Sequence, residues 1–135
     1  MERVDSPHFR LTFDACNFHF AGAEPYPYAY DVLKDYVAYV HLKDGARYDS
    51  SRHGEQVLRF TDHSGEYVCL PLGQGAINYH GLLVQLEKDG YNGYLALEPH
   101  VEAERVGETY RQTLGYLEMM GMMRKTSQPK CYHER

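Results

Sequence analysis

The sequence has no long apolar run and no export signal. Among its 135 residues, no stretch approaches the roughly 20 consecutive apolar residues that a membrane-spanning helix requires. The first residues, MERVDSPHF, are charged and lack the apolar region of a signal peptide. We therefore expect a cytoplasmic protein with no membrane partner.

Cysteine and positive charge are also scarce. The three cysteines, Cys16, Cys69 and Cys131, are widely spaced and include no CxxC pair. The sequence therefore predicts neither a zinc knuckle nor a disulfide framework. Lys and Arg number 14 against 19 Asp and Glu, which gives a net charge of −5. Proteins that bind nucleic acid usually carry a basic surplus, so we expect no nucleic-acid partner.

Several well-known catalytic motifs are missing. The sequence contains no Walker loop, no nucleophile elbow and no HExxH motif. Gly73-Gln74-Gly75 is too short to be a phosphate-binding fingerprint. With 43% hydrophobic and 24% charged residues, the composition is that of an ordinary globular domain.

Apolar runs of strand length alternate with segments of helical periodicity. The pattern predicts three strands, each followed by a helix, with a long connection after the second strand. Proline opens the first helix, Asn78 is the N-cap of the second, and Gly90 is its C-cap. The predicted strands are 9–14, 37–42 and 94–98, and the predicted helices are 27–36, 78–90 and 102–123. Residues 16–23 and 43–76 are predicted as loops, the second with one hairpin of strands 56–60 and 67–70 that turns at 62–65.

Strand–helix alternation predicts an α/β fold with a parallel sheet and right-handed crossovers. Three such units are less than half of an eight-unit barrel, and a three-stranded parallel sheet has two open edges. The first strand also begins abruptly, so the pattern predicts an incomplete domain. Residues 126–135 are polar, and we expect them to form a flexible C-terminal tail.

Each predicted strand carries a potential metal ligand at its end. Asp14 lies in LTFDACNF, His41 in YVHLKD and Glu98 in YLALEPH. Barrel enzymes place their chemistry at the carboxyl ends of parallel strands, and these ligand types suit Mn²⁺, Mg²⁺, Co²⁺ or Zn²⁺. Each residue alone has an ordinary explanation: Asp as a cap, His as a solvated side chain, Glu before Pro as a strand end. The same placement in all three units favours a divalent metal site.

Four motifs in this order resemble a known family. They are FDxxN in LTFDACNF, HLKD, LGxG in PLGQG, and a strand that ends in LE. HLKD alone is moderately specific, but the set at these spacings is a strong signal. The chain resembles the C-terminal part of the sugar phosphate isomerase/epimerase superfamily, the xylose isomerase-like TIM barrels, over about residues 8–124. The resemblance implies a partial TIM barrel domain in residues 1–125.

The resemblance also implies residue roles. Asp14, His41 and Glu98 match three of the four ligands that hold one divalent ion in that family. Asn17 stands where many members carry a substrate-binding His, and Lys43 belongs to the HLKD signature. The implied substrate-binding residues are Asn17, Lys43, Arg47 and His100.

The implied reaction is isomerisation or epimerisation of a small sugar, sugar phosphate or keto-sugar. Glu98 would be one of two bases that move a proton next to a carbonyl through an enediolate. The second Glu and the first strands have no counterpart in this chain. We therefore expect either a partner chain that supplies the N-terminal half barrel or a homo-oligomer.

Two other hypotheses stay open. A truncated, non-catalytic remnant that binds a ligand or oligomerises would keep the same motifs. Abasic-site endonucleases share the barrel but need extra zinc ligands before the LGxG motif, where this chain has Tyr67 and Cys69. The acidic net charge also disfavours DNA.

Overall fold

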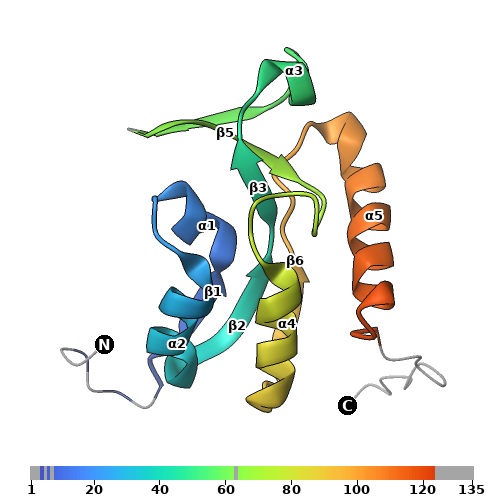
Figure 1. Cartoon of the computed structure of the whole chain (residues 1–135). Coiled ribbons are helices and arrows are strands. Elements are labelled where there is room, and N and C mark those ends of the chain that lie inside the picture. The colour runs from blue at the N-terminus through green and yellow to red at the C-terminus, as the bar shows by residue number, and fades with distance from the viewer. Residues whose placement is uncertain (1–3, 5, 7, 63, 124–135) are drawn as a thin grey trace, which may run out of the picture.

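The structure, a computed structural model, describes residues 4, 6, 8–62 and 64–123. The predicted flexible tail at 126–135, and His63 in the predicted turn, lie outside these residues. Three strands form a parallel sheet in the order β1-β2-β6: β1 Leu11–Asp14, β2 Val37–Leu42 and β6 Tyr94–Leu97 (Figure 1). The three predicted strands and their parallel pairing are confirmed. The sheet does not close into a barrel within the described part of the chain, so the fold is a partial TIM barrel.

A second sheet of three antiparallel strands follows the end of β2. Its order is β3-β5-β4, with β3 Asp44–Arg47, β4 Arg59–Asp62 and β5 Gly65–Leu70. The predicted hairpin corresponds to β4 and β5, although β4 starts later than expected. Strand β3 was not expected from the sequence, because four residues with a glycine show too little alternation to indicate a strand. The helix α3, Ser50–His53, was not expected either, because four residues are too short to show helical periodicity.

The segment between β1 and β2 is more helical than predicted. A loop was expected at 16–23, but Ala15–Phe20 form helix α1, whose first turn is capped by the Asp14 side chain. The predicted helix 27–36 starts earlier and changes type along its length. It consists of η1 Pro25–Ala29, α2 Tyr30–Leu33 and η2 Lys34–Tyr36. Two prolines that donate no N–H and the non-helical Tyr26 (φ −145°) prevent one regular helix.

The two later helices agree with the sequence pattern. Helix α4 spans Tyr79–Lys88, and the Asn78 side chain accepts a hydrogen bond from the backbone N–H of Gly81, as an N-cap does. Gly90 follows it with φ +72°, a left-handed conformation that suits glycine after a helix end. Helix α5, Val106–Met119, is shorter than the predicted 102–123 and is preceded by η3 Ala103–Arg105.

The core lies between the parallel sheet and its helices. Strand β2 sends Val40 and Leu42 into a cluster that contains Leu82, Leu83 and Leu86 of α4. Because side chains alternate along a strand, Tyr39, His41 and Lys43 share the opposite face. The polar side chains of β2 therefore lie on the face of the sheet that turns away from α4.

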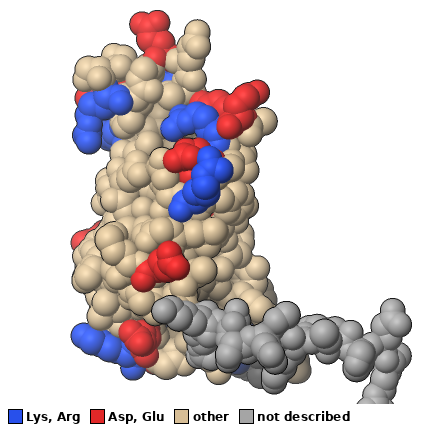
Figure 2. Space-filling view, turned by 90° about the vertical axis from the view of Figure 1, so that its right-hand side faces the viewer, with Lys and Arg blue, Asp and Glu red and all other residues tan. Residues whose placement is uncertain are grey.

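Charges of both signs are scattered over the surface that bears α5. Figure 2 shows Lys and Arg next to Asp and Glu on this face, with a broad uncharged area between them. Two of the ion pairs lie on η3 and α5, Arg105–Glu102 at 3.3 Å and Arg111–Glu108 at 2.5 Å. None of the helices in the described residues is long and apolar enough to cross a membrane.

Candidate metal centre

The parallel register brings the three strand-end residues to one level. Asp14 at the end of β1 is the register partner of His41 in β2, and His41 is the partner of Ala96 in β6. The backbone N–H of Glu98 donates to the carbonyl of Leu42 at 3.2 Å, so Glu98 continues the pairing of β6 with β2. The carboxyl ends of the three strands therefore present Asp, His and Glu side by side.

These three side chains form a compact cluster. His41 Nδ1 lies 3.6 Å from Asp14 Oδ2 and 3.1 Å from Glu98 Oε2. Within the described part of the chain they are the one group of three His, Cys, Asp or Glu whose ligand atoms all lie within 4.8 Å of one another. Asp14 is buried, and His41 and Glu98 are partly exposed, so the cluster opens to solvent on one side.

Lys43 lies inside this cluster. Its Nζ is 2.9 Å from Asp14 Oδ2 and 3.0 Å from Glu98 Oε2, and its side chain is only 3% exposed. Burial works to lower the pKa of Lys43, but its contacts with the two carboxylates outweigh burial and raise that pKa. Burial would likewise raise the pKa of Glu98, but Lys43, with His41 and His100, lowers it below its ordinary value. Lys43 is therefore a cation at neutral pH and Glu98 a carboxylate.

The residues present fit a divalent ion. Ligand atoms bound at 2.0–2.2 Å to one ion lie about 3.0–3.6 Å from each other, which matches the two distances from His41 Nδ1. Asp14 Oδ2 is buried and has no hydrogen-bond partner among the described residues, although it forms the ion pair with Lys43. Two carboxylates beside one ammonium leave one negative charge uncompensated, which favours a bound cation. Asp14, His41 and Glu98 would be its ligands.

Asp44 holds the loop beside this site, a role that the sequence analysis did not assign. Its carboxylate is fully buried and accepts backbone N–H groups of Gly45 at 2.8 Å, Gly73 at 2.9 Å and Gly75 at 3.0 Å. A more distant fourth donor is Ile77, at 3.4 Å. Burial raises the pKa of Asp44 although these backbone donors lower it in part. The last residue of HLKD thus binds the LGxG loop, which explains why the two motifs occur together.

Tyr79 holds the backbone of Lys43 and was also missed. Its hydroxyl donates to the Lys43 carbonyl at 2.7 Å and accepts from the Lys43 N–H at 3.2 Å. The ring is buried at the start of α4, next to the Asn78 cap. The only signal in the sequence was an aromatic residue at the first position of a helix. Helix α4 therefore positions the end of β2.

The predicted substrate-binding residues lie at different distances from the Asp14–His41–Glu98 cluster. His100 Nε2 lies 3.6 Å from Glu98 Oε1, at the edge of the cluster. Asn17 is exposed in α1, and its backbone N–H donates to Asp14 Oδ1 at 3.0 Å. Arg47 lies apart: it contacts the Ser64 carbonyl at 2.8 Å and the Tyr67 ring, and it lines a separate cavity of about 790 Å³ that none of the three candidate ligands borders.

Polar side chains gathered at the carboxyl ends of parallel strands lie where TIM barrels carry their active sites. The family described as xylose isomerase-like TIM barrel matches residues 1–125, and the chain belongs to this family.

Two known proteins are similar to this chain. The 3-dehydro-D-guloside 4-epimerase of Escherichia coli (strain K12) is 27% identical over 84 residues, which are 62% of this chain and 24% of that protein. The crystal structure of a xylose isomerase domain protein from Planctomyces limnophilus has the same fold with a TM-score of 0.65 and 22% identity, over 92% of this chain and 40% of that one. The chain thus spans less than half the length of each.

Proposed function

We propose that this chain carries one part of the active site of a divalent-metal-dependent isomerase or epimerase of a small sugar, sugar phosphate or keto-sugar. The observation that carries the proposal is the Asp14–His41–Glu98 cluster at the carboxyl ends of three adjacent parallel strands. Membership in the xylose isomerase-like family and the similarity to a sugar epimerase support the substrate class.

Glu98 is the proposed catalytic base. Its lowered pKa keeps it ionised at neutral pH, so it can accept a proton from the carbon next to the substrate carbonyl. When bound, Mn²⁺, Mg²⁺, Co²⁺ or Zn²⁺ would polarise the carbonyl and stabilise negative charge on its oxygen. Loss of the proton leaves an enediolate, and Lys43 and His100 are placed beside Glu98 to donate hydrogen bonds to substrate oxygens.

The other two proposed substrate contacts depend on substrate size. Asn17 stands one turn along α1 from Asp14 and is exposed. Arg47 faces its own cavity with Tyr67, so it would contact the substrate only if that substrate extends beyond the metal cluster.

A second base has to come from outside the three strands. Epimerisation returns the proton to the opposite face of the carbon, where Glu98 does not lie. We propose that a second copy of this chain or a partner chain supplies that group together with the remaining strands. Residues 1–125 would then form one part of the complete domain.

We also propose a cytoplasmic location, which the free thiols of Cys16 and Cys69 fit.

A non-catalytic role is the alternative. The observation that favours it is the open sheet of three strands, which lacks a closed barrel in the described residues. In that case the chain would bind a ligand or oligomerise without turnover, and the ion pairs of Lys43 with Asp14 and Glu98 would serve only to hold the cluster together.

Metal content decides between these proposals. We expect the purified chain, loaded with Mn²⁺ or Co²⁺ and freed of excess ion, to retain roughly one ion per chain. His41→Ala should lose it, while His80→Ala, which changes an exposed histidine of α4, should keep it. Circular dichroism would establish that the variants are folded. Equal metal in the parent and in His41→Ala, or none in either, would contradict the metal centre and favour the non-catalytic role.

A further inference from the structure

Two buried cysteines meet beside the candidate metal centre. Cys16 of α1 is 0% exposed and Cys69 of β5 is 4% exposed, and both are free thiols. Each thiol shifts the pKa of the other: the neighbouring Cys69 side chain, with burial, raises the pKa of Cys16, and the Cys16 side chain lowers the pKa of Cys69. They are 53 positions apart in the sequence, so only the packing of α1 on the antiparallel sheet brings them together.

The packing of α1 on β5 explains why the two sulfurs face each other. Phe20 lies one turn after Cys16 on the same side of α1, about 6 Å along the helix. Tyr67 lies two residues before Cys69 on the same side of β5, which is a similar distance of about 6.8 Å along the strand. The Phe20 and Tyr67 rings contact each other with centroids 4.7 Å apart and a tilt of 37° between their planes. Matching spacings on the helix and the strand therefore place the second pair, Cys16 and Cys69, in contact as well.

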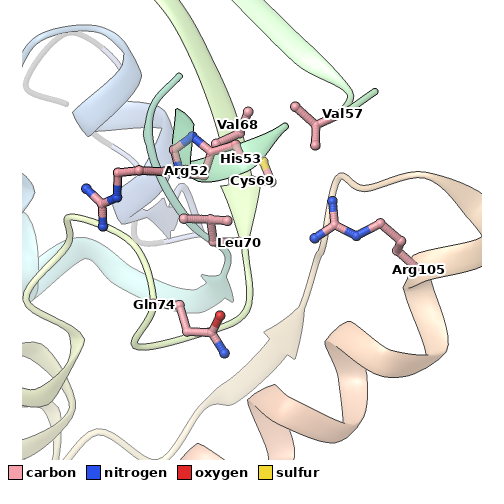
Figure 3. Close-up of a pocket in the computed structure, with 8 residues that line it drawn as sticks. All are labelled: Arg52, His53, Val57, Val68, Cys69, Leu70, Gln74 and Arg105. Atoms are coloured by element: carbon pink, nitrogen blue, oxygen red, sulfur yellow. The ribbon is translucent and has the colours of Figure 1, made fainter. Parts of the chain in front are cut away.

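A small reagent can approach this pair from one side. Cys69 lines a cavity of about 290 Å³ together with Arg52, His53 and Arg105 (Figure 3). Two arginines at this cavity favour a negatively charged sulfur or oxygen there. Cys16 does not line the cavity, so Cys69 is the thiol that a reagent meets first.

We propose that Cys16 and Cys69 form a reversible disulfide when the chain meets a peroxide. The Cys69 sulfur attacks one peroxide oxygen, the O–O bond breaks, and Cys69 becomes a sulfenic acid with release of water. The Cys16 sulfur then attacks the Cys69 sulfur, the S–O bond breaks, and a second water leaves with the Cys16 proton. Two thiols are oxidised by two electrons in total, and the peroxide is reduced to water.

The disulfide would join α1 to β5 covalently. Asp14 caps α1 two residues before Cys16, so the bond would hold the helix and its cap against the antiparallel sheet. A dithiol reductant would restore both thiols by exchange. The proposal depends on neither a bound metal nor catalytic activity, so it stands independently of the proposed function.

Peptide mapping of the full chain tests this directly. The reduced protein is treated with hydrogen peroxide, unfolded, alkylated with N-ethylmaleimide and digested without reduction. We expect alkylated thiols to fall from three to one per chain, with Cys131 the one that remains, and the Cys16 and Cys69 peptides to appear linked. Dithiothreitol before alkylation should restore all three.

Variants separate this pair from other thiol chemistry. Cys131→Ser should form the same link, and Cys16→Ser should leave Cys69 as a sulfenic acid that a dimedone probe captures. Full alkylation of Cys16 and Cys69 after peroxide, a link that involves Cys131, or Cys69 oxidised to a sulfinic acid without a link would each overturn the proposal. If a serine variant fails to fold, the peptide map of the parent chain still decides.

Discussion

Asp14 uses its two carboxylate oxygens for different purposes. Oδ1 accepts the backbone N–H of Asn17 and caps α1, while Oδ2 faces His41 and Lys43. In the sequence a helix cap and a metal ligand are competing explanations for Asp14, but in the structure the two oxygens allow both. Capping fixes the side chain so that the second oxygen points at the cluster.

Asp44 shows how one side chain can determine a loop. Replacing it with Ala should lower the free energy of unfolding by about 3 kcal/mol, because three close backbone N–H groups would lose their acceptor in a buried place. Chemical denaturation measures this difference. Asp49→Ala, which changes an exposed cap of α3, is the control and should cost less than about 1 kcal/mol. Equal losses in the two variants would mean that Asp44 does not hold the loop.

The helices that cover the parallel sheet also position the site. Helix α4 packs Leu82, Leu83 and Leu86 against the sheet and, through Tyr79, holds the backbone of Lys43. The LGxG loop precedes it, and Gly73 has φ +83° with the Tyr116 ring only 2.4 Å from where a Cβ would stand. The loop therefore lies directly against α5, which only glycine allows at this position.

The start of α4 depends on its cap. Asn78→Ala should lower the free energy of unfolding by about 1 kcal/mol, because the Gly81 N–H loses the side-chain acceptor that caps the helix. Urea denaturation followed by circular dichroism measures the change. Asn92→Ala, at an exposed position outside helices and strands, should change stability by less than about 0.5 kcal/mol. A loss at Asn92 as large as that at Asn78 would argue against the capping role.

At the scale of the whole molecule, the two outer strands of the parallel sheet pair with no further strand among the described residues. Strand β1 and strand β6 are the outer strands, and Tyr94 of β6 is 77% exposed beside Tyr39 of β2, with ring centroids 6.1 Å apart. Exposed edges and aromatic side chains of this kind favour pairing with further strands. Association with a second copy or with a partner chain stays a prediction.

Sedimentation of the purified chain tests association. We expect a mass above that of the monomer, and we expect Tyr94→Lys to shift the population toward monomer because it places a charge on the edge strand. Tyr28→Lys changes a tyrosine that is 69% exposed in η1, away from the sheet, and should leave the mass unchanged. A monomeric parent at high concentration would contradict the prediction for the isolated chain.

The sequence by itself determined the parallel strands and the helix that Asn78 caps, and it placed Asp14, His41 and Glu98 at neighbouring strand ends, because each is encoded by a local signal of periodicity or position. It did not reveal β3 or α1, which are short and take their conformation from neighbours rather than from propensity. Only the tertiary structure decided that Lys43 lies between two carboxylates, that Asp44 binds the LGxG loop, and that Cys16 meets Cys69. These contacts join residues tens of positions apart, and their geometry depends on how the helices and the second sheet pack on the first.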